Sequence, residues 1–102
     1  CIADAYPVSE GHSLVIPCRH VVDGMDLHQP EWNAVTALLK QRRHDLEVAD
    51  ASISGFNIGL NSGASAGQTV MHAHWHLIPR RKGDTPDPRG GVRGVIAHKQ
   101  RY

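Results

Sequence analysis

The sequence predicts one small domain that combines β-strands with a single long helix. The chain has 102 residues, which is enough for one real but modest hydrophobic core. Apolar residues recur at helical spacing between residues 30 and 50, and four other segments have the composition of strands. The predicted order of elements is therefore strand, strand, helix, strand, strand.

The strands are predicted from short apolar runs next to turn residues. Residues 2–6 and the segment SLVIP at 13–17 indicate two strands around a turn at 7–11. Residues 55–60 (GFNIGL) indicate the third strand, and residues 69–78 the fourth.

The helix is predicted from Pro30 to about Asp50. Proline suits the first turn of a helix, and Asp26, Gln29 and Glu31 lie near the positive end of its dipole. Six apolar side chains are expected to face the sheet: Trp32, Val35, Leu38, Leu39, Leu46 and Ala49.

The composition excludes a membrane-spanning protein. The longest apolar runs are only a few residues long, and no charged segment followed by an apolar one opens the chain. We therefore expect a soluble, cytoplasmic protein with neither a membrane nor a nucleic acid as partner. Cys1 and Cys18 form no disulfide framework and no C-x-x-C zinc motif. Because the chain opens on Cys1 without an initiator methionine, we expect this single domain, residues 1–102, to lack some N-terminal sequence.

The net charge of +1 hides an asymmetry between the two parts of the chain. Residues 1–67 carry a net charge of −4, and residues 68–102 carry +5. The basic part favours an anion such as phosphate, and a solvated tail that binds nothing explains it equally well.

The segment HAHWHLIPR, residues 72–80, has three histidines at alternate positions. On a strand, His72, His74 and His76 would share one face, with Ala73, Trp75 and Leu77 on the other. Two such imidazoles can reach one zinc ion, and neutral imidazole can also attack phosphorus as a nucleophile. A structural role for all three on one face is less plausible, and spacing alone leaves zinc and catalysis open.

The segment NSGASAG, residues 61–67, precedes this strand. Small residues allow backbone N–H groups to approach an anion closely, which suits a phosphate. Glycine, serine and asparagine are also the usual residues of a plain hairpin connection. Four side-chain donors lie in this region: Asn61, Ser65, Gln68 and Thr69.

These motifs resemble the histidine triad (HIT) family of nucleotide hydrolases and transferases, whose signature is His-φ-His-φ-His-φ-φ with φ apolar. The similarity extends over GFNIGLNSGASAGQTVMHAHWHLIPRRKGD at residues 55–84 and DAYPVSEGHSLVIPCRH at residues 4–20. The resemblance implies an α+β fold in which an antiparallel sheet with one main helix extends across a homodimer. Trp75 is bulkier than the usual residue of the family at its position.

The resemblance also implies a role for four histidines. His74 would be the nucleophile that attacks the α-phosphate of a nucleotide, giving a nucleotidyl-histidine that water hydrolyses to the nucleoside monophosphate. His76 would contact the phosphates and assist the leaving group, while His72 and His12 would brace the site.

The substrate-binding residues implied by the resemblance are Asn61, Gln68 and Thr69 for the phosphates and Asp4 for the ribose. The expected substrate is a purine nucleotide of adenosine type with an ester, anhydride or phosphoramidate bond. No cofactor is required for this chemistry, although Mg²⁺ can accompany a polyphosphate substrate and zinc stays open. The open alternatives are a zinc-binding module and a slow nucleotide-binding regulator that use the same histidines.

Overall fold

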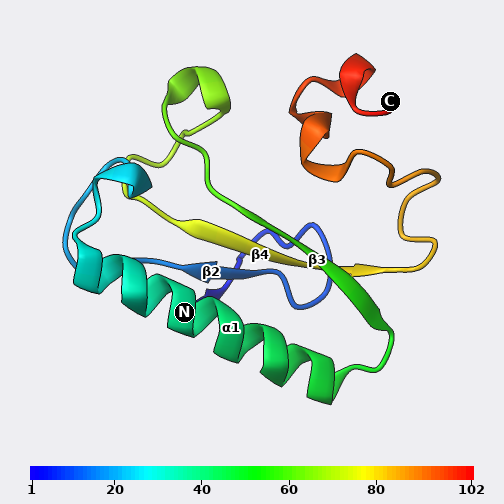
Figure 1. Ribbon diagram of the computed structural model, residues 1–102, viewed down its shortest axis with the longest axis horizontal. Coiled ribbons are helices and arrows are strands. Elements are labelled where there is room, and N and C mark those ends of the chain that lie inside the picture. Colours follow the sequence, from blue (N-terminus) through cyan, green and yellow to red (C-terminus); the bar gives the residue numbers. More distant parts are fainter.

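The computed structural model describes all 102 residues and has one helix packed on a four-stranded sheet (Figure 1). The helix α1 spans Gln29–Ala49. The strands are β1 (Ile2–Ala3), β2 (Ser13–Val15), β3 (Ile53–Gly59) and β4 (Trp75–Arg81). They are arranged in the order β1-β2-β4-β3, and every pair is antiparallel. The predicted α+β class and antiparallel sheet are confirmed.

The prediction of one strand over residues 69–78 was wrong in its first half. The strand β4 begins only at Trp75, whose backbone partner Val15 is the last residue of β2. Residues 69–74 have no neighbouring strand, and Ala73 instead donates its N–H to the carbonyl of Val21 (2.7 Å). His72 and His74 therefore precede the strand, and only His76 lies in it.

The first predicted strand is also shorter than expected, because β1 ends at Ala3. The Oδ1 atom of Asp4 accepts a hydrogen bond from the backbone N–H of Tyr6 (2.9 Å), which turns the chain at this point.

The helix α1 begins one residue before Pro30 and ends one residue before Asp50. At its start, the Glu31 carboxylate accepts the backbone N–H of His28 (2.9 Å) and a hydrogen bond from Arg19 (2.8 Å). The hydrogen bond from Arg19 is the main reason that the pKa of Glu31 is lowered to about 2. This carboxylate thus caps the helix over most of the pH range.

One face of α1 forms the core with the sheet. Val35 is buried with Val15 and Ala73, and the ring of Trp32 meets Trp75 edge to face at 5.2 Å. Leu39 and Leu46 also pack inward, as predicted. The prediction was wrong for two residues, Leu38 and Ala49, which are exposed. Leu38 lies about 100° around the helix from Leu39 and so leaves the apolar stripe, and Ala49 is the last helical residue.

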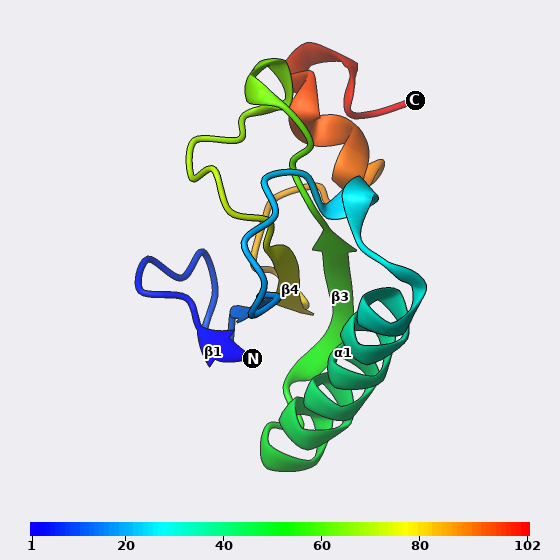
Figure 2. The ribbon, with the colours of Figure 1, turned by 90° about the vertical axis from the view of Figure 1, so that its left-hand side faces the viewer.

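The two faces of β4 have different environments. Leu77 and Pro79 are fully buried, and Pro79 lies beside Leu46 of the helix at the position of Gly11. The alternate residues, His76 and Ile78, face the other side of the sheet. Figure 1 shows α1 and the C-terminal segment on opposite sides of the sheet, and Figure 2 shows the same arrangement after a turn of 90°. No helix is both long and apolar enough to cross a bilayer.

Candidate functional site

Four segments that are distant in sequence bring the candidate residues together. His76 lies in β4 between Leu14 of β2 and Gly59 of β3. His12 directly precedes β2, and its carbonyl accepts the backbone N–H of Asp4 (3.0 Å). This pairing explains the eight-residue spacing of Asp4 and His12, because the two residues face each other across the β1–β2 hairpin.

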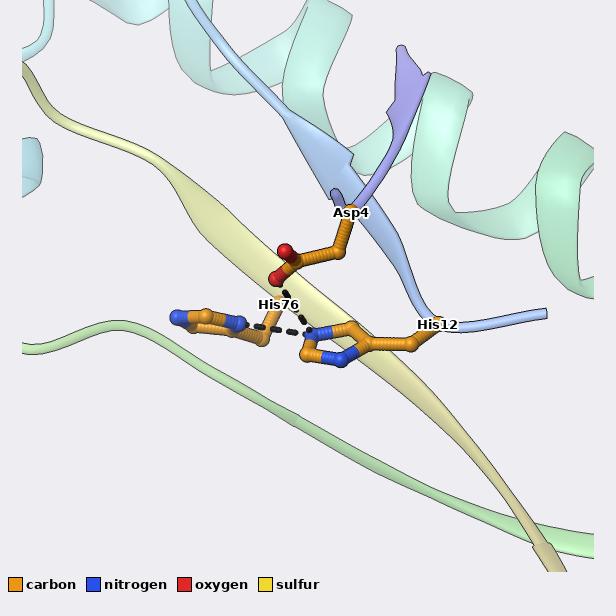
Figure 3. A group of neighbouring side chains, drawn as sticks. All are labelled: Asp4, His12 and His76. Carbon is orange, nitrogen blue, oxygen red and sulfur yellow. Dashed lines mark hydrogen bonds and ion pairs between the residues drawn. The ribbon is translucent and has the colours of Figure 1, made fainter. Parts of the chain in front are cut away.

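A chain of hydrogen bonds fixes the protons of His12 and His76 (Figure 3). The backbone N–H of Val8 donates to Nδ1 of His12 (3.2 Å), so neutral His12 carries its proton on Nε2. That Nε2 lies 2.9 Å from Nδ1 of His76 and donates to it. His76 therefore carries its own proton on Nε2, where it can be donated to a bound molecule.

Asp4 borders this chain. One of its carboxylate oxygens, Oδ2, lies 3.4 Å from Nε2 of His12, and the other is held by the Tyr6 N–H. Figure 3 shows the carboxylate turned toward the His12 ring. The shorter contact of His12 is with His76, so Asp4 acts on the pair mainly through its charge.

His76 is set up to remain neutral. Burial lowers the pKa of His76, and the nearby imidazoles of His12 and His74 lower it further, while Asp4 opposes the shift. His12 itself is only 3% exposed. A neutral His76 is the form that accepts from His12 and keeps a single transferable proton on Nε2.

His74 has one free nitrogen. Its Nδ1 lies 2.9 Å from the backbone carbonyl oxygen of His72, which can only accept a hydrogen bond. Nδ1 of His74 therefore carries the proton, and its Nε2 has an unshared electron pair. The His74 and His76 rings lie edge to face with centroids 5.2 Å apart, so a ring nitrogen with a free electron pair and a ring with a free N–H are neighbours.

The side chain of His72 is hydrogen-bonded to the backbone of a distant segment. Its Nε2 donates to the carbonyl of Pro17 (2.8 Å), and its Nδ1 lies 3.3 Å from Nδ1 of His20. The sequence reasoning missed His20. The only signal for it was its presence in the segment 4–20 that resembles the family, since no spacing rule links it to His72.

The glycine-rich loop is held by Gln68, which is 4% exposed. Its carbonyl oxygen accepts the N–H of Gly63 (3.0 Å), and its amide nitrogen donates to the carbonyls of Val22 (2.6 Å) and Val70 (3.2 Å). Both polar atoms of the Gln68 side chain are therefore bound within the protein. The loop contains the helical turn η2 (Ala64–Ala66), and glycines flank it at φ +93° and +95°, a region that other residues rarely adopt.

Asn61 and Thr69 differ from Gln68, because neither side chain makes a hydrogen bond within the protein. Asn61 lines a cavity of about 400 Å³ together with His12 and His76. The rest of this cavity is largely apolar, with Leu60, Ile78, Val92 and Val95 among its walls. The cavity therefore combines polar groups with aliphatic side chains.

A metal ion does not fit the arrangement of the best candidate ligands. Ligand atoms of Asp4, His12 and His76 lie within 4.8 Å of one another. A metal on this cluster needs the electron pair of His12 Nε2, but the Val8 N–H at Nδ1 places the proton on Nε2. The hydrogen bonds thus favour a proton chain over metal coordination.

The comparisons with known proteins show the family and the fold to which this chain is similar. The HIT domain profile matches residues 1–83. An uncharacterized HIT-like protein of Mycoplasma genitalium is 46% identical over 77 residues, which cover 76% of this chain and 54% of that protein. The asymmetrical bis(5'-nucleosyl)-tetraphosphatase of Schizosaccharomyces pombe is 41% identical over 78 residues, 76% of this chain and 42% of that enzyme.

A solved structure shares the fold. A zinc-bound histidine triad family protein from Mycobacterium smegmatis matches with a TM-score of 0.73 and 34% identity, covering 93% of this chain and 73% of that one. The chain spans about half the length of the curated relatives it matches.

Proposed function

Because this chain belongs to the HIT domain family, we propose that it cleaves nucleotides at the α-phosphate through a nucleotidyl-histidine on His74. The observation that carries the proposal is the hydrogen bond from His74 Nδ1 to the His72 carbonyl, which leaves Nε2 as a free nucleophile beside a proton donor.

In the first step, the electron pair of His74 Nε2 forms a bond to the α-phosphorus. The bond between phosphorus and the leaving group breaks, and the leaving atom takes the proton from Nε2 of His76. The hydrogen bond from His12 to Nδ1 of His76 keeps that proton on Nε2. In the second step, water attacks phosphorus, its proton returns to His76, and the nucleoside monophosphate leaves His74.

The phosphate oxygens are stabilised by groups that have no other partner. Asn61 and Thr69 supply side-chain donors, and the loop 61–67 supplies those of its backbone N–H groups that are not already bound within the protein. Gln68 acts on the phosphate through the shape of the loop, because its own amide is already bound.

Asp4 binds the ribose in this proposal. Its Oδ2 makes only the 3.4 Å contact with His12, so it can accept hydrogen bonds from the 2′ and 3′ hydroxyls. The substrate is a purine nucleotide, and the related tetraphosphatase supports nucleotides as the class.

The active protein is a homodimer in this proposal. The strand β3 is at the edge of the sheet, and its outer side has no partner strand. A second copy paired along this edge would remove the exposed backbone groups and extend the sheet.

The test is to trap the intermediate. Incubation with an adenylyl substrate labelled at the α-phosphorus, followed by an early quench, should leave label on the protein that is stable in alkali and lost in acid. His74→Ala should abolish the label and lower turnover by several orders of magnitude. His44→Ala, on the exposed side of α1, is the matched control and should label normally.

The opposite result would support the zinc-module alternative. Absence of label, loss of activity on chelation and equal damage from His72→Ala and His74→Ala would show that the imidazoles are metal ligands. The proposal would then be wrong.

A further inference from the structure

The turn that precedes His12 contains a contact that the proposed mechanism does not use. The hydroxyl of Ser9 donates to the backbone carbonyl of Pro79 in β4 at 2.7 Å, an ordinary length for an O–H···O hydrogen bond. The two residues are 70 positions apart in the chain. This bond fixes the turn to the strand that contains His76.

The Ser9 hydroxyl reaches β4 beyond the end of β2. The first residue of β2, Ser13, is paired with Leu77, so β2 does not continue as far as Pro79. Pro79 is fully buried, and a buried carbonyl without a donor costs free energy. The Ser9 side chain gives this carbonyl a donor where no residue of β2 is available.

The backbone of Ser9 closes the turn on its other side. The carbonyl of Ser9 accepts the backbone N–H of His12 (3.1 Å), which makes residues 9–12 a β-turn. Gly11 is the third residue of this turn and has φ +92°, a positive value of the kind that type II turns require. A Cβ atom on Gly11 would lie 3.0 Å from Cδ2 of Leu46 in α1. Ser9 therefore joins the turn both to β4 and to His12.

The backbone N–H of Val8 is the group that this turn positions. It donates to Nδ1 of His12 (3.2 Å), and this bond places the His12 proton on Nε2. Neighbouring side chains give little support, since Tyr6 and Val8 are 89% and 72% exposed. Another hydrogen bond from β4 joins the guanidinium of Arg81 to the carbonyl of Glu10 (2.9 Å), on the exposed side of the turn. The hydroxyl of the adjacent serine is therefore the nearest fixed point for this N–H.

Loss of the Val8 contact would allow the proton chain to run in the opposite direction. Neutral His12 could then carry its proton on Nδ1, and its Nε2 would accept a hydrogen bond instead of donating one. His76 would have to donate from Nδ1, which would leave no proton on its Nε2. The Asp4 carboxylate favours the arrangement seen here, but its 3.4 Å contact with His12 is longer than an ordinary hydrogen bond (Figure 3). A mixture of the two arrangements is expected.

We propose that Ser9 is a positioning residue of the His12–His76 proton chain. Its hydroxyl, bound to Pro79, holds the Val8 N–H against Nδ1 of His12. The transferable proton of His76 thereby stays on Nε2. The inference rests on the proposed function for its effect on turnover, and on the hydrogen bonds alone for its effect on the two tautomers.

The experiment compares two substitutions of Ser9 in the full chain. Ser9→Ala removes the hydroxyl, and Ser9→Thr keeps it. At about pH 8, where histidine is neutral, nitrogen NMR should find the His76 proton on Nε2 in the wild type and in Ser9→Thr, and a mixture of tautomers in Ser9→Ala. With an AMP phosphoramidate, Ser9→Ala should lower kcat about threefold to fivefold, the size expected for one hydrogen bond, and leave KM unchanged. Ser9→Thr should retain most of the wild-type kcat.

Ser13→Ala is the matched control, because Ser13 lies in the same hairpin and also binds a backbone carbonyl. Its hydroxyl donates to the carbonyl of Gly11 (2.8 Å) and accepts from Nε of Arg42 (3.0 Å), and neither bond involves an imidazole. Ser13 is fully buried, so its substitution should lower the midpoint of thermal unfolding at least as much as Ser9→Ala does. The His76 proton should nevertheless stay on Nε2 in this control.

Three results would overturn this inference while label still forms on His74: a His76 tautomer that Ser9→Ala leaves unchanged, the same mixture in Ser13→Ala, or a higher KM with kcat unchanged in Ser9→Ala. The last result would mean that Ser9, which also borders a cavity of about 590 Å³, contacts the substrate directly. Absence of label on His74 in the wild type would overturn the proposed function, and the tautomer comparison would still decide whether Ser9 controls the proton chain.

Discussion

Two pairs of histidines lie near opposite ends of the HAHWHL segment, and they differ in what their protons can do. In the inner pair, His12 and His76, a backbone N–H fixes one ring and the hydrogen bond between the rings fixes the other. In the outer pair, His20 and His72, the rings approach at 3.3 Å on an exposed surface, and His72 is bound to a carbonyl. The inner pair has a ring N–H with no partner in the protein, whereas in the outer pair His72 is bound to the carbonyl of Pro17.

The comparison shows that adjacent histidines of one motif can have different chemistry because of their backbone partners. The backbone N–H of Val8 donates to Nδ1 of His12, so the proton of His12 is on Nε2, beside His76. The carbonyl of Pro17 accepts the Nε2 proton of His72, which is therefore bound to the backbone. The predictions below separate these two functions.

The largest effect is expected for His76. If it protonates the leaving group, His76→Ala should lower kcat/KM for an AMP phosphoramidate by about 10²–10⁴-fold. For the p-nitrophenyl ester of AMP, whose leaving group needs no proton, the same variant should lose less than about tenfold. His72→Ala, in the outer pair, should affect both substrates alike. Equal losses on both substrates for His76→Ala would contradict its role as the proton donor.

A smaller effect is expected for His12, which acts through His76. His12→Gln removes the imidazole donor to His76 Nδ1, and loss of one buried hydrogen bond should lower kcat/KM by about tenfold. His20→Gln, the matching change in the outer pair, should remain within about twofold. Nitrogen NMR should find the His76 proton on Nε2 in the wild type and in His20→Gln, and a mixture of tautomers in His12→Gln. A tautomer of His76 that is unaffected by His12→Gln would refute the proton chain.

Much of the fold could be predicted because it depends on local patterns. The stripe of Trp32, Val35, Leu39 and Leu46 located α1, and the strand composition located most of the sheet. Within β4, residues on the two faces of the sheet alternate around Leu77, as the sequence predicts. This alternation does not extend back to His72, because the partner strand β2 ends opposite Trp75, and the length of a strand depends on its partner strand as well as on its composition.

The site was harder to predict, because its contacts join distant segments. His12 and His76 are 64 residues apart and meet only because β2 and β4 are adjacent in the sheet. The family resemblance grouped them, while spacing could not. Nothing in the sequence indicated that the amide of Gln68 is bound within the protein, or that Arg80 and Arg81 form ion pairs. Two cations of the basic segment are thus neutralised within the fold, which weakens the expectation of a general anion-binding surface.

The smallest effect concerns pH and is specific to the inner pair. Because the pKa of His76 is lowered in the folded protein, His76 should stay neutral and active below the ordinary histidine value of 6.5. The contribution of His76 to the acid limb of kcat/KM should therefore lie below pH 6.5. Asp4 opposes the shift, so Asp4→Asn should lower the pKa of His76 further and move the acid limb to lower pH.

Glu47→Gln, an exposed charge change on α1, should leave the acid limb in place. The free energy of unfolding should also fall as the pH falls. Between pH 6.5 and the lower pKa of His76 in the folded protein, the unfolded chain binds a proton that the folded protein does not bind. His76→Gln should remove this dependence, as measured by urea unfolding at several pH values. An acid limb above pH 6.5, or one that moves upward in Asp4→Asn, would contradict the assignment of this limb to His76.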